Sequence, residues 1–450
     1  MLHITFASKN RLLPKLEVQD LSNSEENVTG PSHSPEPSHL SFFEKIQSAI
    51  LHTFESLENR NFRLLWFGMV FSMWGIQMQM VARGILVYDL TGDYTITGFV
   101  GMGFAPSLLV VSLFGGVLGD RMERRSIIQT AQLVNGLLAG VVGILIFLDV
   151  VVWQHLFVVS MIQGAMFAFM MPARQAAIPS LVKKHQLANA FALNAMAMSI
   201  MSLVAPAMAG YVYQFIGAEV VYFVICAVMV SAVVFTSMVP KMYPSDRSIK
   251  DSVVRNMLAG FRYIGRNKVL LQLMIYSVIV ALLAMPFRML VPAYAKDVYR
   301  SAGSEVGILL TATGLGALVG SIAIANLREG HHRGWVLIGG AIIAGLSLAL
   351  ISGFPVFLAG VIAMVGTGIG EQARWALGQS VMMENSADEY RSRVMSVLMM
   401  TYGLMPLGMY PLGWSMEKFG AQQAVGIIAV LLIGFAVLAV FLLPNLRRIK

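Results

Sequence analysis

Long apolar runs separated by short polar segments cover most of this 450-residue chain. A run of about 20 apolar residues can cross a bilayer, because the hydrocarbon core is about 30 Å thick and a helix rises 1.5 Å per residue. Twelve runs are long enough, and we predict a transmembrane helix for each. They are Leu64–Val87, Gly98–Leu118, Ile127–Leu148, Leu156–Ile178, Ala188–Ile216, Val220–Val239, Val269–Pro292, Gly307–Leu327, Trp335–Phe354, Phe357–Met383, Val394–Met416 and Ala421–Leu443.

Polar and amphipathic segments divide the chain further. Residues 1–40 are rich in Ser and Pro and are expected to form a disordered cytoplasmic tail. Residues 41–60 place apolar side chains at helical spacing, which predicts an amphipathic helix on the membrane surface. The linker 241–268 repeats this pattern. The predicted organisation is completed by a first six-helix bundle over 61–240, a second over 269–444 and a cytoplasmic C-terminus at 445–450.

Composition and charge support a membrane protein. Hydrophobic residues make up 57% of the chain and charged residues 12%, against roughly a quarter in soluble domains. With the N-terminus inside, the cytoplasmic segments hold 25 of the 32 Lys and Arg residues, so the positive-inside rule predicts that both termini are cytoplasmic. Basic loops beside anionic lipid account for the net charge of +8, and we expect no nucleic-acid partner.

The two sets of six runs resemble each other within the sequence. Ala173-Arg174-x-Ala176-x-x-x-Ser180 matches Ala373-Arg374-x-Ala376-x-x-x-Ser380 at an offset of 200 residues. Internal repeats of this kind build a central cavity in transporters. We therefore predict an all-α integral membrane protein, with twelve transmembrane helices in two pseudo-symmetric six-helix bundles around a central cavity.

Ionisable side chains inside the membrane are costly and suggest function. Arg83 and Arg288 are expected near the outer interface of the membrane. Two roles are open for them: contact with lipid headgroups, or a place in the substrate path. Gln79 could join Arg83 in a polar lining. Glu371 and Arg374 are three residues apart and can pair on one helix face, as a structural pair or as the coupling site that binds protons. Arg174 lacks a local acid, which favours a gate or a helix-end contact.

The segment Gly116-Val-Leu-Gly-Asp120-Arg121-Met-Glu-Arg124-Arg125 resembles the loop between helices 2 and 3 of major facilitator superfamily transporters. Glu123 replaces a glycine of that pattern. The resemblance implies a cytoplasmic latch, in which Asp120 lies against the start of helix eleven near Arg393, because a helix N-terminus attracts negative charge. Its basic residues would hold the inner loops together when the cavity faces outward.

Helix five also resembles a known pattern. Ala205-Pro206-Ala207-Met-Ala209-Gly210 is similar to the Gly-Pro-x-x-Gly-Gly pattern of drug/proton antiporters, which implies a kinked, closely packed helix. The alternative is a mid-helix proline without that role. Helix four departs from the antiporters, since no arginine precedes Gln163-Gly164.

Further segments, including Asn59-Arg-Asn61-Phe-Arg63 and Arg391-Ser-Arg393-Val-Met-Ser396, resemble the enterobactin-exporter-like group. The resemblance implies a monomeric, proton-coupled exporter of drug- or siderophore-like molecules in the cytoplasmic membrane, working by alternating access among membrane lipids. An uptake symporter, a lipid flippase and a non-transporting scaffold are the alternatives. We expect no enzyme activity, cofactor or metal, because the histidines lack metal-type spacing and no nucleophile-base arrangement is present.

Overall fold

The structure is a computed structural model that describes residues 55–119, 122–243, 253–301, 303–325, 332–387, 389–447 and 449. The chain divides into two units, Met1–Ile50 and Leu51–Lys450, and every described residue belongs to the second. The predicted tail over 1–40 and most of the predicted surface helix over 41–60 lie outside the described residues. The domain bounds remain predictions.

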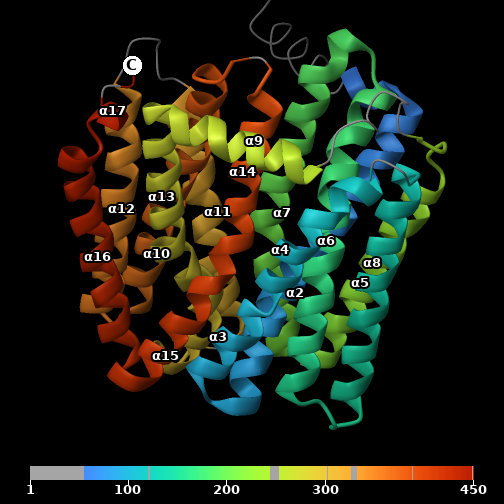
Figure 1. The fold of residues 1–450 in the computed structure, drawn as a ribbon. Coiled ribbons are helices and arrows are strands. Elements are labelled where there is room, and N and C mark those ends of the chain that lie inside the picture. Colours follow the sequence, from blue (N-terminus) through green and yellow to red (C-terminus); the bar gives the residue numbers. More distant parts are fainter. Residues whose placement is uncertain are drawn as a thin grey trace, which may run out of the picture. The chain divides into compact units, whose positions relative to one another are not determined.

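Every regular element in the described part of the chain is a helix (Figure 1). The first half consists of α2 (Arg60–Thr91), α3 (Tyr94–Met102), α4 (Phe104–Gly119), α5 (Arg124–Phe147), α6 (Trp153–Leu181), α7 (Leu187–Phe215) and α8 (Ala218–Ser237). After the connecting helix α9 (Val253–Arg266), the second half consists of α10 (Lys268–Val298), α11 (Gly303–Ala325), α12 (Arg333–Gly353), α13 (Phe357–Glu384), α14 (Arg391–Leu404), η4 (Met405–Gly408), α15 (Met409–Phe419) and α16 (Ala421–Leu442). Short elements are η1 (Glu55–Glu58), η2 (Lys184–Gln186) and α17 (Pro444–Arg447).

The first helix of each half begins in the same way. The side chain of Asn59 accepts hydrogen bonds from the first free N–H groups of α2, and Asn267 does so for α10. An asparagine at this position satisfies N–H groups that have no partner inside the helix. At its far end α2 stops at Gly92, whose φ of 62° suits a residue without a side chain.

Among the residues that the structure describes, ten helices are long and apolar enough to cross a membrane, against the twelve predicted. The two remaining predicted runs correspond to α13 and to the α14–η4–α15 segment. Helix α13 has 28 residues, but Glu371, Gln372 and Arg374 make its second part polar. The predicted run Val394–Met416 is broken by η4, which contains Pro406, and a proline cannot donate the backbone hydrogen bond of a continuous helix. The membrane-spanning all-helical fold is confirmed, and the exact count of twelve remains a prediction.

The internal repeat is visible in the structure. Arg174 of α6 and Arg374 of α13 are 2% and 4% exposed, so the two copies of the repeated segment bury the same side chain. Helix pairs within each half also correspond, since α5 packs on α8 in the first half and α12 packs on α16 in the second.

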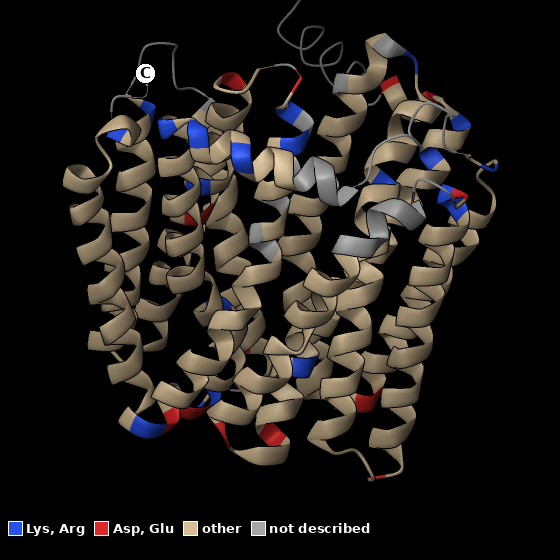
Figure 2. Cartoon of the chain, viewed as in Figure 1, with Lys and Arg blue, Asp and Glu red and all other residues tan. Residues whose placement is uncertain are grey.

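The two ends of the helix bundle differ in the charged residues that they carry (Figure 2). Lys and Arg gather at the end where the chain finishes, which we call the basic end. The opposite end, the acidic end, carries mainly Asp and Glu. The long middle region between the ends has few charged residues, which fits a hydrocarbon environment.

Helix α9 joins the halves at the basic end and packs on α14 (Figure 1). A β-carbon on Gly260 would lie 2.9 Å from the carbonyl oxygen of Arg393, so the two backbones are in close contact. The ring of Tyr263 stacks on that of Tyr390, with centroids 4.4 Å apart. These contacts fasten the connecting helix to the second half.

Candidate functional site

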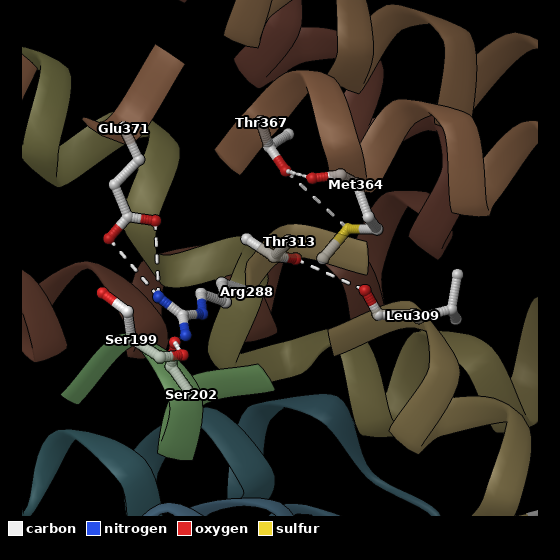
Figure 3. A network of polar contacts seen from close by, with 8 residues as sticks. All are labelled: Ser199, Ser202, Arg288, Leu309, Thr313, Met364, Thr367 and Glu371. Atoms are coloured by element: carbon white, nitrogen blue, oxygen red, sulfur yellow. Dashed lines mark hydrogen bonds and ion pairs between the residues drawn. The ribbon is translucent and has the colours of Figure 1, made fainter. Parts of the chain in front are cut away.

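An ion pair lies inside the second half (Figure 3). Nη1 of Arg288, on α10, is 3.4 Å from each carboxylate oxygen of Glu371, on α13. The two side chains are 22% and 24% exposed. Figure 3 also labels Ser199 and Ser202 of α7, where the hydroxyl of Ser202 donates to the carbonyl of Ser199. Helix α7 of the first half packs on α11. The predicted pairing of Glu371 with Arg374 is therefore wrong, because Glu371 reaches a neighbouring helix instead of its own next turn.

A small cavity surrounds this ion pair, and we call it the second-half cavity. Its lining comes from α10, α11, α12 and α13, and includes Arg288, Glu371 and Arg374 together with apolar side chains such as Phe287 and Met364. The space for the centres of water-sized molecules is about 20 Å³, enough for one or two waters. In this conformation the cavity has room for water but not for a drug-sized molecule.

The corresponding arginine of the first half also turns inward. Nη1 of Arg83, on α2, donates to Oε1 of Gln163, on α6, over 2.8 Å. Arg83 lines a second small cavity, the interface cavity, with Thr97 of α3, Met289 of α10 and Met409 of α15. Of the two predicted roles, the structure favours the interior one over contact with lipid headgroups. Gln79 is 3% exposed and lines neither cavity.

Helices α7 and α11 bring the two halves into close contact along a line we call the α7–α11 seam. A β-carbon on Gly210 would lie 2.1 Å from the carbonyl oxygen of Gly303, and one on Gly307 would lie 2.8 Å from that of Pro206. The hydroxyl of Thr311 donates to the carbonyl of Leu203 over 2.7 Å. Helix α7 continues through Pro206. The predicted close packing therefore involves a helix of the opposite half.

Polar contacts join the halves at the acidic end. Lys296 of α10 pairs with Asp89 of α2. The hydroxyl of Tyr94 donates to Asp297 over 2.9 Å, and the Tyr94 N–H donates to Glu417 over 3.0 Å. We call these five residues the acidic-end seal. No sequence motif marks these residues, and the one local signal is that charged residues follow directly after apolar runs.

The loop at the basic end is described only in part. Asp120 and Arg121 of the predicted latch lie outside the described residues, and Gly116 is within α4. Arg124 donates to the carbonyl of Ala176 over 3.0 Å, and Arg125 donates to that of Val239 over 2.7 Å. Both partners belong to the first half.

Two further residues of this region have defined surroundings. Glu123, which replaces the superfamily glycine, accepts hydrogen bonds from the hydroxyl of Ser126 and from the N–H of Met242. It thereby fastens the loop to the start of the linker. The guanidinium of Arg393 lies 5.2 Å from the centroid of the Tyr390 ring. Its predicted approach to Asp120 remains a prediction.

The predicted gate residue Arg174 is buried in α6. Its Nε and Nη2 atoms have no hydrogen-bond partner among the residues that the structure describes. The expected helix-end contact is therefore not seen in that part of the chain, and a gating role remains a prediction.

The chain is similar to known proteins over most of its length. A family model described as a transmembrane secretion effector matches residues 51–450. Macrolide efflux protein A of Streptococcus pyogenes is 25% identical over 376 residues, which cover 80% of this chain and 89% of that protein. The enterobactin exporter of Shigella boydii is 24% identical over 298 residues, covering 64% of this chain and 67% of that protein.

A solved structure shares the fold. The crystal structure of a POT family transporter in complex with 5-aminolevulinic acid matches with a TM-score of 0.70 and 13% identity, over 86% of this chain and 97% of that chain. At this identity the likeness concerns the arrangement of helices alone.

Proposed function

Because this chain belongs to the transmembrane secretion effector family of the major facilitator superfamily, we propose that it exports small amphipathic molecules by alternating access between its two halves. It is a multi-pass membrane transporter and not an enzyme. Substrates that resemble drugs or siderophores are supported by the names of its relatives, a macrolide efflux protein and an enterobactin exporter.

The position of the contacts between the halves supports the proposal of alternating access. In the described residues, the ion pair between the halves and the hydrogen bonds from one half to carboxylates of the other lie at the acidic end, where Asp89, Tyr94 and Lys296 take part. Such contacts exchange for water when the end opens, at little net cost. The positive-inside rule makes the basic end cytoplasmic. The conformation is then closed toward the outside, in the cytoplasmic membrane of a bacterium.

The coupling ion in this proposal is the proton, and its acceptor is Glu371. A proton on this carboxylate removes the negative charge that holds Arg288, so the contact between α10 and α13 weakens. Because α13 packs on α11, which in turn packs on α7 of the first half, a change in the contact between α10 and α13 alters the packing between the halves. Coupling of proton binding to transport requires an equilibrium between two conformations that the proton shifts, and the contact between α10 and α13 provides it in this proposal.

Transport into everted membrane vesicles tests this function. Vesicles that contain the full chain and are energised by respiration should accumulate fluorescent amphipathic dyes, and collapse of the pH gradient should release them. Glu371→Gln should abolish the response to pH, whereas Glu384→Gln, at the exposed end of the same helix, should retain it. Dye movement in the opposite direction would indicate an uptake symporter, and no movement with any dye would contradict export.

A further inference from the structure

The two cavities share an excess of positive charge. The second-half cavity is lined by Arg288 and Arg374 against one acid, Glu371. The interface cavity is lined by Arg83, and its hydrogen-bond partner Gln163 is neutral. Counting the described lining residues, each cavity carries one more positive charge than negative charge.

Arg374 is the cation without a counter-charge in the second-half cavity. It is 4% exposed, and it has no hydrogen-bond or ion-pair partner among the described residues. Arg374 interacts electrostatically with Tyr276. The hydroxyl of Tyr276 donates to the carbonyl of Leu337 over 2.7 Å. Because no described residue accepts from the guanidinium, its donors can reach a molecule that enters the cavity.

A buried guanidinium without a partner is costly, and an anion that enters the cavity removes that cost. The planar fork of arginine donors matches a carboxylate or a similar planar anion. Apolar side chains beside it, such as Val280, Phe287 and Met364, suit the apolar body of an amphipathic molecule. The lining thus places a positive charge beside apolar surface.

The three arginines also lie at different depths. At 1.5 Å per residue, Arg374 is about 25 Å along α13 from the acidic end, Arg288 about 15 Å from that end of α10, and Arg83 about 12 Å from that end of α2. An anion moving from the basic end toward the acidic end would meet them in this order.

We propose that the exported molecules carry one carboxylate-like anionic group, which binds Arg374 in the second-half cavity and then passes to Arg83 in the interface cavity. This proposal rests on the export function proposed above. A monoanion neutralises the excess charge of the site. Its export from a cell with a negative interior is also favoured by the membrane potential, by about 50-fold for each 100 mV.

A matched pair of probes tests the charge preference on the purified full chain. The probes are a dansyl-labelled eleven-carbon carboxylic acid and its primary amide, with binding followed by dansyl fluorescence. The acid should bind about tenfold or more tightly than the amide, as charge-assisted hydrogen bonds to arginine require. Equal affinities, or tighter binding of the amide, would overturn the proposal.

Variants assign the preference to one residue. Arg374→Gln should remove the difference between the probes by weakening the binding of the acid about tenfold or more, and Arg374→Lys should keep part of the difference. Lys418→Gln removes one charge from an exposed position at the acidic end and should leave the preference intact. A preference that survives in Arg374→Gln would show that the anion binds elsewhere and would contradict the assignment.

The same probes in everted vesicles separate the two proposals. Uptake of neutral or cationic dyes without uptake of the carboxylate would refute the anionic substrate class and leave export standing. If no probe of any charge moves while the purified chain binds the carboxylate through Arg374, export fails and the anion site stands.

Discussion

The two halves use the same scaffold for different chemistry. In each, an arginine on the first helix reaches the fourth helix, but Arg83 meets the amide of Gln163 and Arg288 meets the carboxylate of Glu371. A side-chain amide does not change its charge at physiological pH, whereas a carboxylate can bind or release a proton. The duplicated architecture thus preserves the position of a cation, while the second half alone adds a proton acceptor at this contact.

Moving the acid to the other half should have the largest effect. In the double variant Gln163→Glu with Glu371→Gln, Arg83 gains the carboxylate and Arg288 loses it. We expect pH-driven export to fall about tenfold or more, because the coupling free energy depends on where the proton binds. Dye export by vesicles, at equal membrane levels of the protein, measures it. Normal export by the double variant would mean that the halves are interchangeable.

The backbone contacts between halves provide a second comparison. A β-carbon on Gly210 of α7 would lie 2.1 Å from the Gly303 oxygen, and one on Gly98 of α3 would lie 2.4 Å from the Met409 oxygen. Gly210→Ala and Gly98→Ala should each lower the stability by about 1–3 kcal/mol, since a backbone must shift. Thermal unfolding in detergent measures the change. Gly434→Ala is the control, because nothing lies within 4 Å of its added carbon.

The latch should act on one side only. Asp120→Asn should lower efflux a few fold by destabilising the outward-facing state, because a charge at a helix N-terminus contributes about 0.3–1 kcal/mol. The matched change in the second half is Glu329→Gln, in a loop whose sequence lacks the Asp-Arg pair. We expect it to leave efflux unchanged. Equal losses in both variants would favour a symmetric latch, and unchanged accumulation in Asp120→Asn cells would remove the latch from the mechanism.

The smallest effect is expected at the acidic-end seal. Asp89 and Lys296 are 31% and 26% exposed, so solvent screens their attraction. A double-mutant cycle with Asp89→Asn and Lys296→Met should give a coupling free energy of about 0.2–1 kcal/mol in unfolding experiments. The pair Arg333–Glu384 at the basic end of the second half is the comparison. A coupling energy of several kcal/mol would identify the seal as a dominant contact between the halves.

The sequence predicted the helices well because length and apolarity are properties of single segments. It also predicted the repeat, since Arg174 and Arg374 share a spacing that can be read directly. The partner of Glu371 could not be predicted in the same way. The spacing of three residues pointed to Arg374, but the position of α10 beside α13 decides the pairing, and no local pattern encodes that position.

A similar limit applies to Arg83. The sequence showed no arginine ahead of Gln163 on the fourth helix, and depth alone could not say which way Arg83 would point. The structure brings the arginine to that glutamine from α2. Arg63 and Arg83 are 20 residues apart, as are Lys268 and Arg288, and this equal spacing is a sequence signal that the two first helices correspond.

The α7–α11 seam also has a consequence for biogenesis. Gly210 and Gly307 belong to helices that the ribosome delivers almost a hundred residues apart, on either side of the linker. Helices insert into a membrane individually and associate afterwards. The glycine surface of α7 therefore stays exposed to lipid until the second half has been inserted. Formation of this contact is a late step of assembly, and it distinguishes mature chains from unfinished ones.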